Sequence, residues 1–84
     1  DAVRQAITSR TRALLLNSPT NPTGVVFRPE ILRELTTLGI PVISDEIYAD
    51  LSYGSRPQSI LEFTEEAIAL NGFSKYYAMT GWRL

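Results

Sequence analysis

The chain has 84 residues, a hydrophobic fraction of 44%, a charged fraction of 20% and a formal net charge of −1. These values are typical of globular proteins and allow one small domain at most. The charge balance does not indicate a basic surface for nucleic acid, and the longest apolar run, 13–16, is far too short to span a membrane. Cysteine and histidine are absent, which excludes disulfides and thiolate chemistry and removes the commonest general base.

The N-terminal part of the chain predicts a helix followed by a buried strand. Apolar residues at helical spacing within residues 1–8 indicate the end of a helix. Residues 13–17 (ALLLN) form a short apolar run that stops at a dense turn signal, 18–24 (SPTNPTG). A run of this length bounded by turn residues is typical of a buried strand in a parallel sheet.

Residues 29–38 (PEILRELTTL) are the clearest helix in the sequence. Pro29 suits a first helical position, and Gly39 is expected to be the C-cap. Residues 41–44 (PVIS) then predict a second strand that ends at the acidic pair 45–46, which completes a strand–helix–strand unit with an expected right-handed crossover. The helix carries one apolar stripe: Ile31, Leu32, Leu35 and Leu38.

The C-terminal half predicts one more strand after an irregular segment. Residues 49–65 contain glycine, proline and small polar residues, with a short helical turn expected around 59–63. Residues 67–71 (AIALN) form the third apolar run, and residues 76–84 are expected to bend and begin another strand. The fold class predicted from this order of elements is therefore α/β with a mostly parallel sheet.

Polar groups follow the three predicted strands. Asn21 comes just after the first strand, Asp45 ends the second, and Ser74 and Lys75 follow the third. In open α/β sheets, ligands bind beyond the carboxyl ends of the strands. We therefore expect an amide, a carboxylate, a hydroxyl and an amine to meet at one edge of the sheet.

Three segments, SPTNPTG, SDEIY and GFSKYYAMTGWRL, resemble the signature segments of class I aminotransferases, which are fold type I pyridoxal-phosphate enzymes. Their order agrees with that family, and the resemblance covers nearly the whole chain. The most specific pattern is Lys75, preceded directly by Ser74 and followed eight residues later by Arg83. The resemblance implies that residues 1–84 are a fragment of the cofactor-binding large domain, within a three-layer αβα sandwich. The ends of the sequence, Asp1 and Leu84, agree with the expectation of an internal piece.

The resemblance assigns the catalytic role to Lys75, whose amine would form a Schiff base with pyridoxal 5'-phosphate and move a proton at the substrate carbon. A surface lysine in a loop is the alternative. Asp45 matches the carboxylate that keeps the pyridine nitrogen of the cofactor protonated, so that the ring can accept electrons. An aspartate that caps the turn after a strand is the alternative. Glu46 would point to the opposite face of an extended segment and is assigned no cofactor role.

Asn21 and Tyr48 match the family's partners for the phenolic oxygen of the cofactor. The resemblance further implies a cis bond at Asn21-Pro22. A packed aromatic residue and a turn-forming asparagine are the alternatives. Ser74 and Arg83 match positions that hold the cofactor phosphate, for which a hydroxyl and a guanidinium are suitable donors. The chain departs from many relatives at Gly72, where they carry a further hydroxyl residue.

The resemblance implies reversible transfer of an amino group from an amino acid to a 2-oxo acid, in a cytoplasmic protein whose full-length form is a homodimer, with no metal, no membrane and no nucleic-acid partner. A pyridoxal-phosphate-dependent lyase of the same fold, the effector domain of a transcriptional regulator and a non-catalytic fragment are the alternatives. Further parts of the family's site, including the arginine that binds the substrate carboxylate, lie outside such segments. The isolated chain is therefore expected to have little or no turnover.

Overall fold

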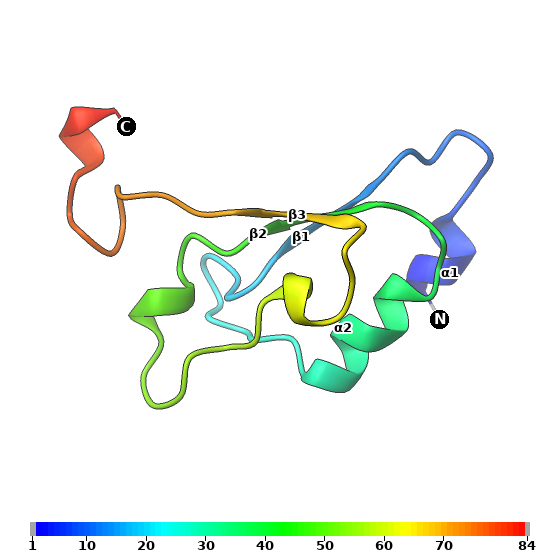
Figure 1. Cartoon of the computed structure of the whole chain (residues 1–84), viewed down its shortest axis with the longest axis horizontal. Coiled ribbons are helices and arrows are strands. Elements are labelled where there is room, and N and C mark those ends of the chain that lie inside the picture. Colours follow the sequence, from blue (N-terminus) through cyan, green and yellow to red (C-terminus); the bar gives the residue numbers. More distant parts are fainter. Residues whose placement is uncertain (1, 84) are drawn as a thin grey trace.

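A computed structural model describes residues 2–83, and its centre is a parallel sheet with helices on one side (Figure 1). Over these residues the sheet has three strands in the order β1-β2-β3, which confirms the predicted α/β class. No helix in this part of the chain has the length and apolar character needed to cross a membrane. The elements in chain order are α1 (Ala2–Ala6), β1 (Leu14–Asn17), α2 (Pro29–Thr36), β2 (Val42–Asp45), β3 (Ala67–Leu70) and the 3-10 turns η1 (Ala49–Leu51), η2 (Ile60–Glu62) and η3 (Thr80–Trp82).

The strands are in register at their carboxyl ends. Asn17 of β1 pairs with Asp45 of β2, and Asp45 pairs with Leu70 of β3. Because all three strands run in the same direction, the segments that follow them leave the sheet at one edge, at the left of Figure 1. This register brings the three signature segments to the same end of the molecule.

One face of the sheet is covered. Val42 of β2 is 1% exposed and packs with Leu32 of α2 and Ile60 of η2, and this cluster is the centre of the core. The opposite face carries no helix within residues 2–83 (Figure 1). Leu15 is 75% exposed and Ile68 is 59% exposed on that face. These side chains form an open apolar face. Such a face is unusual, because parallel sheets generally have both faces buried.

The helix α2 ends earlier than predicted. Its C-cap is Thr37, so the assignment of Gly39 as the C-cap was wrong, although Gly39 does adopt a positive φ of 68° two residues later. The hydroxyls of Thr36 and Thr37 donate to the carbonyls of Arg33 and Glu34 at 2.8 and 2.7 Å. Hydroxyl side chains that bond to nearby carbonyls compete with the helical pattern, which explains the earlier end.

The strand expected within residues 76–84 is also wrong for the part that the structure describes. Tyr77 N–H donates to the carbonyl of Phe73, and Ala78 N–H donates to the carbonyl of Lys75, both at 3.3 Å. These turns, together with the positive φ of Ala78, direct the chain away from the sheet edge, so it does not pair with β3. The segment ends in η3 instead of a strand. The helical turn expected around 59–63 is confirmed as η2.

Candidate functional site

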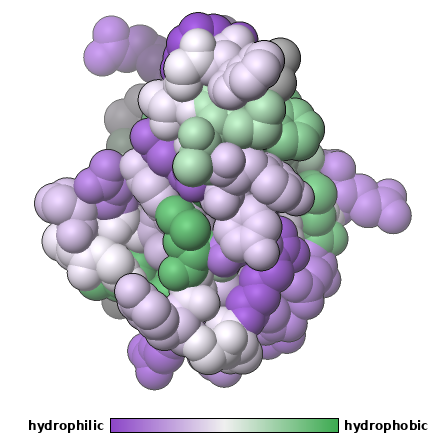
Figure 2. All heavy atoms as spheres, turned by 90° about the vertical axis from the view of Figure 1, so that its left-hand side faces the viewer, coloured by the Kyte–Doolittle hydropathy of each residue, from purple (hydrophilic) through white to green (hydrophobic). Residues whose placement is uncertain are grey.

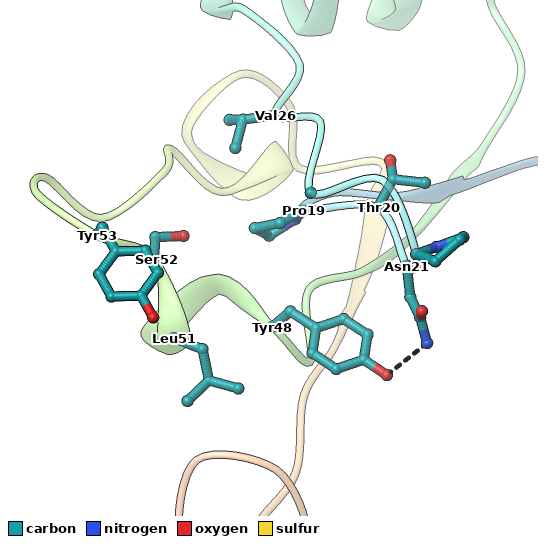
Figure 3. A pocket seen from close by; sticks show the side chains of 10 residues that line it. Pro19, Thr20, Asn21, Val26, Tyr48, Leu51, Ser52 and Tyr53 are labelled. Carbon is teal, nitrogen blue, oxygen red and sulfur yellow. Dashed lines mark hydrogen bonds between the residues drawn. The ribbon is translucent and has the colours of Figure 1, made fainter.

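Asn21 and Tyr48 meet at the carboxyl edge of the sheet. The Nδ2 amide of Asn21 donates to the Oη hydroxyl of Tyr48 at 3.0 Å, across 27 residues of sequence (Figure 3). Asn21 belongs to the turn after β1, and Tyr48 belongs to the turn after β2. The structure therefore brings together the two residues that the sequence proposed for one atom of a cofactor.

The turn that carries Asn21 has two cis peptide bonds, Ser18-Pro19 and Asn21-Pro22. The second was expected from the family resemblance, and the first was not. Gly24 closes the turn with a φ of 70°, and its N–H donates to the carbonyl of Thr20 at 2.7 Å. A glycine suits this position because side chains rarely adopt this backbone conformation.

Asp45 lies at the end of β2, beside Asn17 in the sheet register. Its Oδ1 accepts a hydrogen bond from Ile47 N–H at 3.2 Å, so it caps the following turn, as one alternative reading of the sequence expected. Glu46 turns to the covered face, where it is 6% exposed and accepts a hydrogen bond from Ile60 N–H. The expectation that Glu46 points away from Asp45 agrees with this arrangement.

Lys75 approaches Tyr48 from the segment after β3. Its Nζ lies 5.9 Å from the centroid of the Tyr48 ring, at the outer limit of a cation–π contact. Since Tyr48 also contacts Asn21, all three segments that follow the strands converge on this one aromatic side chain. The Lys75 side chain is exposed and accessible from solvent.

Ser74 and Arg83 lie in the same exposed C-terminal segment, and Thr80 contacts both. The Thr80 hydroxyl donates to the carbonyl of Ser74, and Nη1 of Arg83 donates to the carbonyl of Thr80, each at 3.0 Å. Arg83 has a φ of 55° and is exposed. In this arrangement, the Arg83 guanidinium contacts a carbonyl of its own segment, and the phosphate contacts of Ser74 and Arg83 stay predictions.

A cavity of about 470 Å³ lies beside the Asn21–Tyr48 pair, between the turn 19–26 and the segment 48–53 (Figure 3). Its lining is mainly apolar, and neither Asp45 nor Lys75 contributes to it. Figure 2 looks onto this end of the molecule and shows small hydrophobic areas separated by polar side chains. The described residues 2–83 contain no group of three or more acidic side chains placed to hold a metal ion.

The sequence analysis missed Asn17, the last residue of β1. The sequence pattern marks it only as the end of an apolar run, yet its side chain forms hydrogen bonds with the backbones of both Asp45 and Asn21. The available signal was its polarity: an asparagine that ends an apolar strand just before a turn has both a donor and an acceptor to offer.

The family model for aminotransferase class I and II matches residues 1–84. The chain belongs to this family. A probable aspartate aminotransferase of Methanocaldococcus jannaschii is 40% identical over 88 residues, which cover 100% of this chain and 24% of that protein. The match runs through all three signature segments.

Solved structures agree with the sequence comparison. The aspartate aminotransferase of Thermotoga maritima superposes with a TM-score of 0.89 at 43% identity, over 98% of this chain and 24% of that one. The aromatic aminotransferase of Pyrococcus horikoshii has a TM-score of 0.85 at 42% identity, over 96% of this chain and 24% of that one. The chain thus spans about a quarter of the length of the relatives that it matches.

Proposed function

We propose that the chain is part of a pyridoxal-phosphate-dependent aminotransferase, which transfers an amino group reversibly from an amino acid to a 2-oxo acid. The observation that carries this proposal is the convergence of Asn21, Tyr48 and Lys75, each from a different signature segment, at the carboxyl edge of the sheet. In this proposal, residues 1–84 are a fragment of the cofactor-binding large domain. The parent protein would be a cytoplasmic homodimer.

The residues at this edge fit the ring of the cofactor. Pyridoxal phosphate, when bound, supplies an aldehyde for a lysine amine and a ring that accepts electrons. Asn21 Nδ2 and Tyr48 Oη are hydrogen-bond donors that already lie 3.0 Å apart, so both can turn to a shared oxygen. Two such donors favour the charged form of a phenolic oxygen over its neutral form.

The proposed roles of Asp45 and Lys75 follow from their chemistry. A carboxylate at the position of Asp45 holds a proton on a pyridine nitrogen that faces it. The amine of Lys75 would hold the cofactor through its aldehyde group, and as a free amine it would move a proton at the α-carbon of the substrate. Both residues lie outside the lining of the 470 Å³ cavity. Asn21 and Tyr48 do line that cavity, so we propose that the cofactor would lie next to Tyr48 at the edge of the cavity, toward Asp45 and Lys75.

The phosphate would lie near Ser74 and Arg83. A guanidinium presents a planar pair of donors to phosphate oxygens, and a serine hydroxyl adds a third. To act in this way, the Arg83 guanidinium must leave the Thr80 carbonyl, which it contacts at 3.0 Å. Gly72, in contrast, has no side chain to add a further phosphate contact.

The choice of amino acid is proposed to depend on residues outside this segment. The two matched solved structures are named for aspartate and for aromatic substrates, yet both are more than 40% identical to this chain over the same residues. Since such different side chains are accepted by relatives with nearly the same local structure, residues 1–84 supply the shared chemistry.

Reductive trapping tests the proposal. Lys75 is the single lysine of the chain, so its modification in this segment has an unambiguous position. The full-length protein would be mixed with pyridoxal phosphate, reduced with borohydride and mapped by mass spectrometry. We expect one adduct per subunit on the peptide that contains Lys75. The variant Lys75→Arg keeps the charge and is expected to give none; an adduct on other lysines with Lys75 unmodified would contradict the proposal.

A further inference from the structure

The side chain of Asn17 connects two segments of the proposed site. Its Nδ2 donates to the backbone carbonyl of Asp45 at 3.2 Å, and its Oδ1 accepts from the backbone N–H of Asn21 at 3.0 Å. The backbone carbonyl of Asn17 also accepts the hydroxyl of Thr20 at 2.7 Å. One residue at the end of β1 therefore holds both the neighbouring strand end and the turn that follows.

The amide of Asn17 supplies both the donor and the acceptor that these two contacts need. The carbonyl of Asp45 requires a donor, and the N–H of Asn21 requires an acceptor. A carboxylate lacks the donor, and an aliphatic side chain lacks both groups. If the amide of Asn17 were flipped, its NH₂ would face the N–H of Asn21, and two donors would meet. The two contacts differ in what remains without the Asn17 side chain: the carbonyl of Asp45 still accepts from Ser18 N–H at 3.1 Å, whereas the N–H of Asn21 loses its acceptor.

These contacts form a continuous chain from Asp45 through Asn17 and Asn21 to Tyr48. In the proposed function, Asp45 faces the ring nitrogen of the cofactor, while Asn21 and Tyr48 face its phenolic oxygen. These two atoms belong to one rigid ring, so the spacing of their protein partners must match that ring.

We propose that Asn17 is a positioning residue that sets the spacing between Asp45 and the Asn21–Tyr48 pair. This inference rests on the proposed function. Asn17 itself does not touch the cofactor in this proposal; it acts through the backbone of Asn21. Without its side chain, the backbone of Asn21 is no longer fixed to the end of β1 by this contact, and the Asn21 amide donates less effectively to the phenolic oxygen. Since that hydrogen bond favours the deprotonated form of the lysine-bound cofactor, its loss raises the pH at which the cofactor takes up a proton.

The test uses the pH midpoint of the absorbance of the lysine-bound cofactor in the full-length protein. Asn17→Ala is expected to raise this midpoint by about 1 pH unit, the size expected for a hydrogen bond to a charged oxygen. Asn21→Ala is expected to raise it by a similar amount. If Asn17 acts through Asn21, the double variant shifts no further than Asn21→Ala alone.

Two further variants separate positioning from general destabilisation. Asn17→Asp keeps the acceptor for Asn21 N–H and is expected to give a smaller rise, and it supplies the test if Asn17→Ala does not fold. Ser18→Ala is the matched control, because Ser18 is buried in the same turn but its hydroxyl accepts from Phe27 N–H at 3.1 Å. It is expected to lower the melting temperature and to leave the midpoint unchanged.

The outcomes distinguish this inference from the proposed function. A wild-type protein that shows no absorbance of a lysine-bound cofactor would overturn the proposed function and this inference with it. A normal wild-type midpoint that the Asn17 variants leave unchanged would overturn this inference alone. Additive shifts in the double variant would also overturn it, because Asn17 would then act independently of Asn21.

Discussion

Glu46 accepts a hydrogen bond from the backbone N–H of Ile60 at 2.9 Å, inside the covered face of the sheet. Glu46 is 6% exposed and Ile60 is fully buried. The contact joins the end of β2 to the first residue of η2, which packs on the core. Asp45 and Glu46, though adjacent, thus lie on opposite faces of the sheet. Glu46 holds the end of β2 to η2 on the covered face, and Asp45 lies on the open face.

Replacement of Glu46 by alanine is expected to lower the free energy of unfolding by about 1–3 kcal/mol, because the buried N–H of Ile60 loses its acceptor. Urea titration of the cofactor-free, full-length protein would measure this change. Glu65→Ala removes an exposed carboxylate and is expected to stay within about 0.5 kcal/mol of the wild type. Equal losses in both variants would contradict the structural role assigned to Glu46.

The variant Asp45→Asn is expected to lower kcat of the full-length protein by about 10²-fold, because a neutral amide no longer holds the proton on the ring nitrogen. The Lys75 adduct should still form, since Asp45 takes no part in the attack of the amine. Steady-state kinetics and reductive trapping would separate these two effects. The matched control is Asp50→Asn, which removes a surface ion pair with Arg56 and should leave kcat unchanged.

A side chain at Gly72 would compete with Ile47 for space. A Cβ at Gly72 would lie 3.3 Å from Cδ1 of Ile47, closer than ordinary contact, although the tip of Ile47 can shift. Gly72→Ser is therefore expected to lower the free energy of unfolding by less than about 1 kcal/mol. The cost should disappear in an Ile47→Val background, which removes Cδ1. A double-mutant cycle by urea titration would measure the coupling, and an equal cost in both backgrounds would argue against the contact.

The isolated chain of 84 residues is expected to show no transamination above that of its Lys75→Ala variant. Its sheet has one open apolar face, with Leu15 75% exposed and Ile68 59% exposed, and both Lys75 and Arg83 lie in an exposed segment. A site that is not held by surrounding structure cannot keep its groups in reactive geometry. Assays with several amino acid and 2-oxo acid pairs would measure the rate, and robust turnover would show this expectation to be wrong.

The local elements were predictable where side-chain pattern and chain punctuation agree. The runs 13–17, 41–44 and 67–71 each form a strand because short apolar runs between turn residues favour a buried extended chain. The helix 29–38 was predicted from its proline start and apolar stripe, and only its end differs, because Thr36 and Thr37 bond to nearby carbonyls. The strand predicted within residues 76–84 was wrong, because the chain turns at 73–78 and does not pair with β3.

The candidate site divides in the same way. The places of Asn21, Asp45, Ser74 and Lys75 after the predicted strands identified them as candidates, and the family resemblance of the signature segments added Tyr48 and Arg83. The contacts of Asn17 with Asp45 and of Glu46 with Ile60 were not predictable from the order of residues along the chain.

The sequence by itself determined the family, the order of the three strands and of the helix between the first two, and the chemical groups that follow each strand. Only the tertiary structure decided that Asn21 donates to Tyr48, that Asn17 links Asn21 to Asp45, and that one face of the sheet is open. The physical reason is that the contacts of Asn21 with Tyr48 and of Asn17 with Asp45 join residues 27 and 28 positions apart, so they depend on strand register and on the path of the connecting turns. Local propensity acts over a few residues and carries no information about that register.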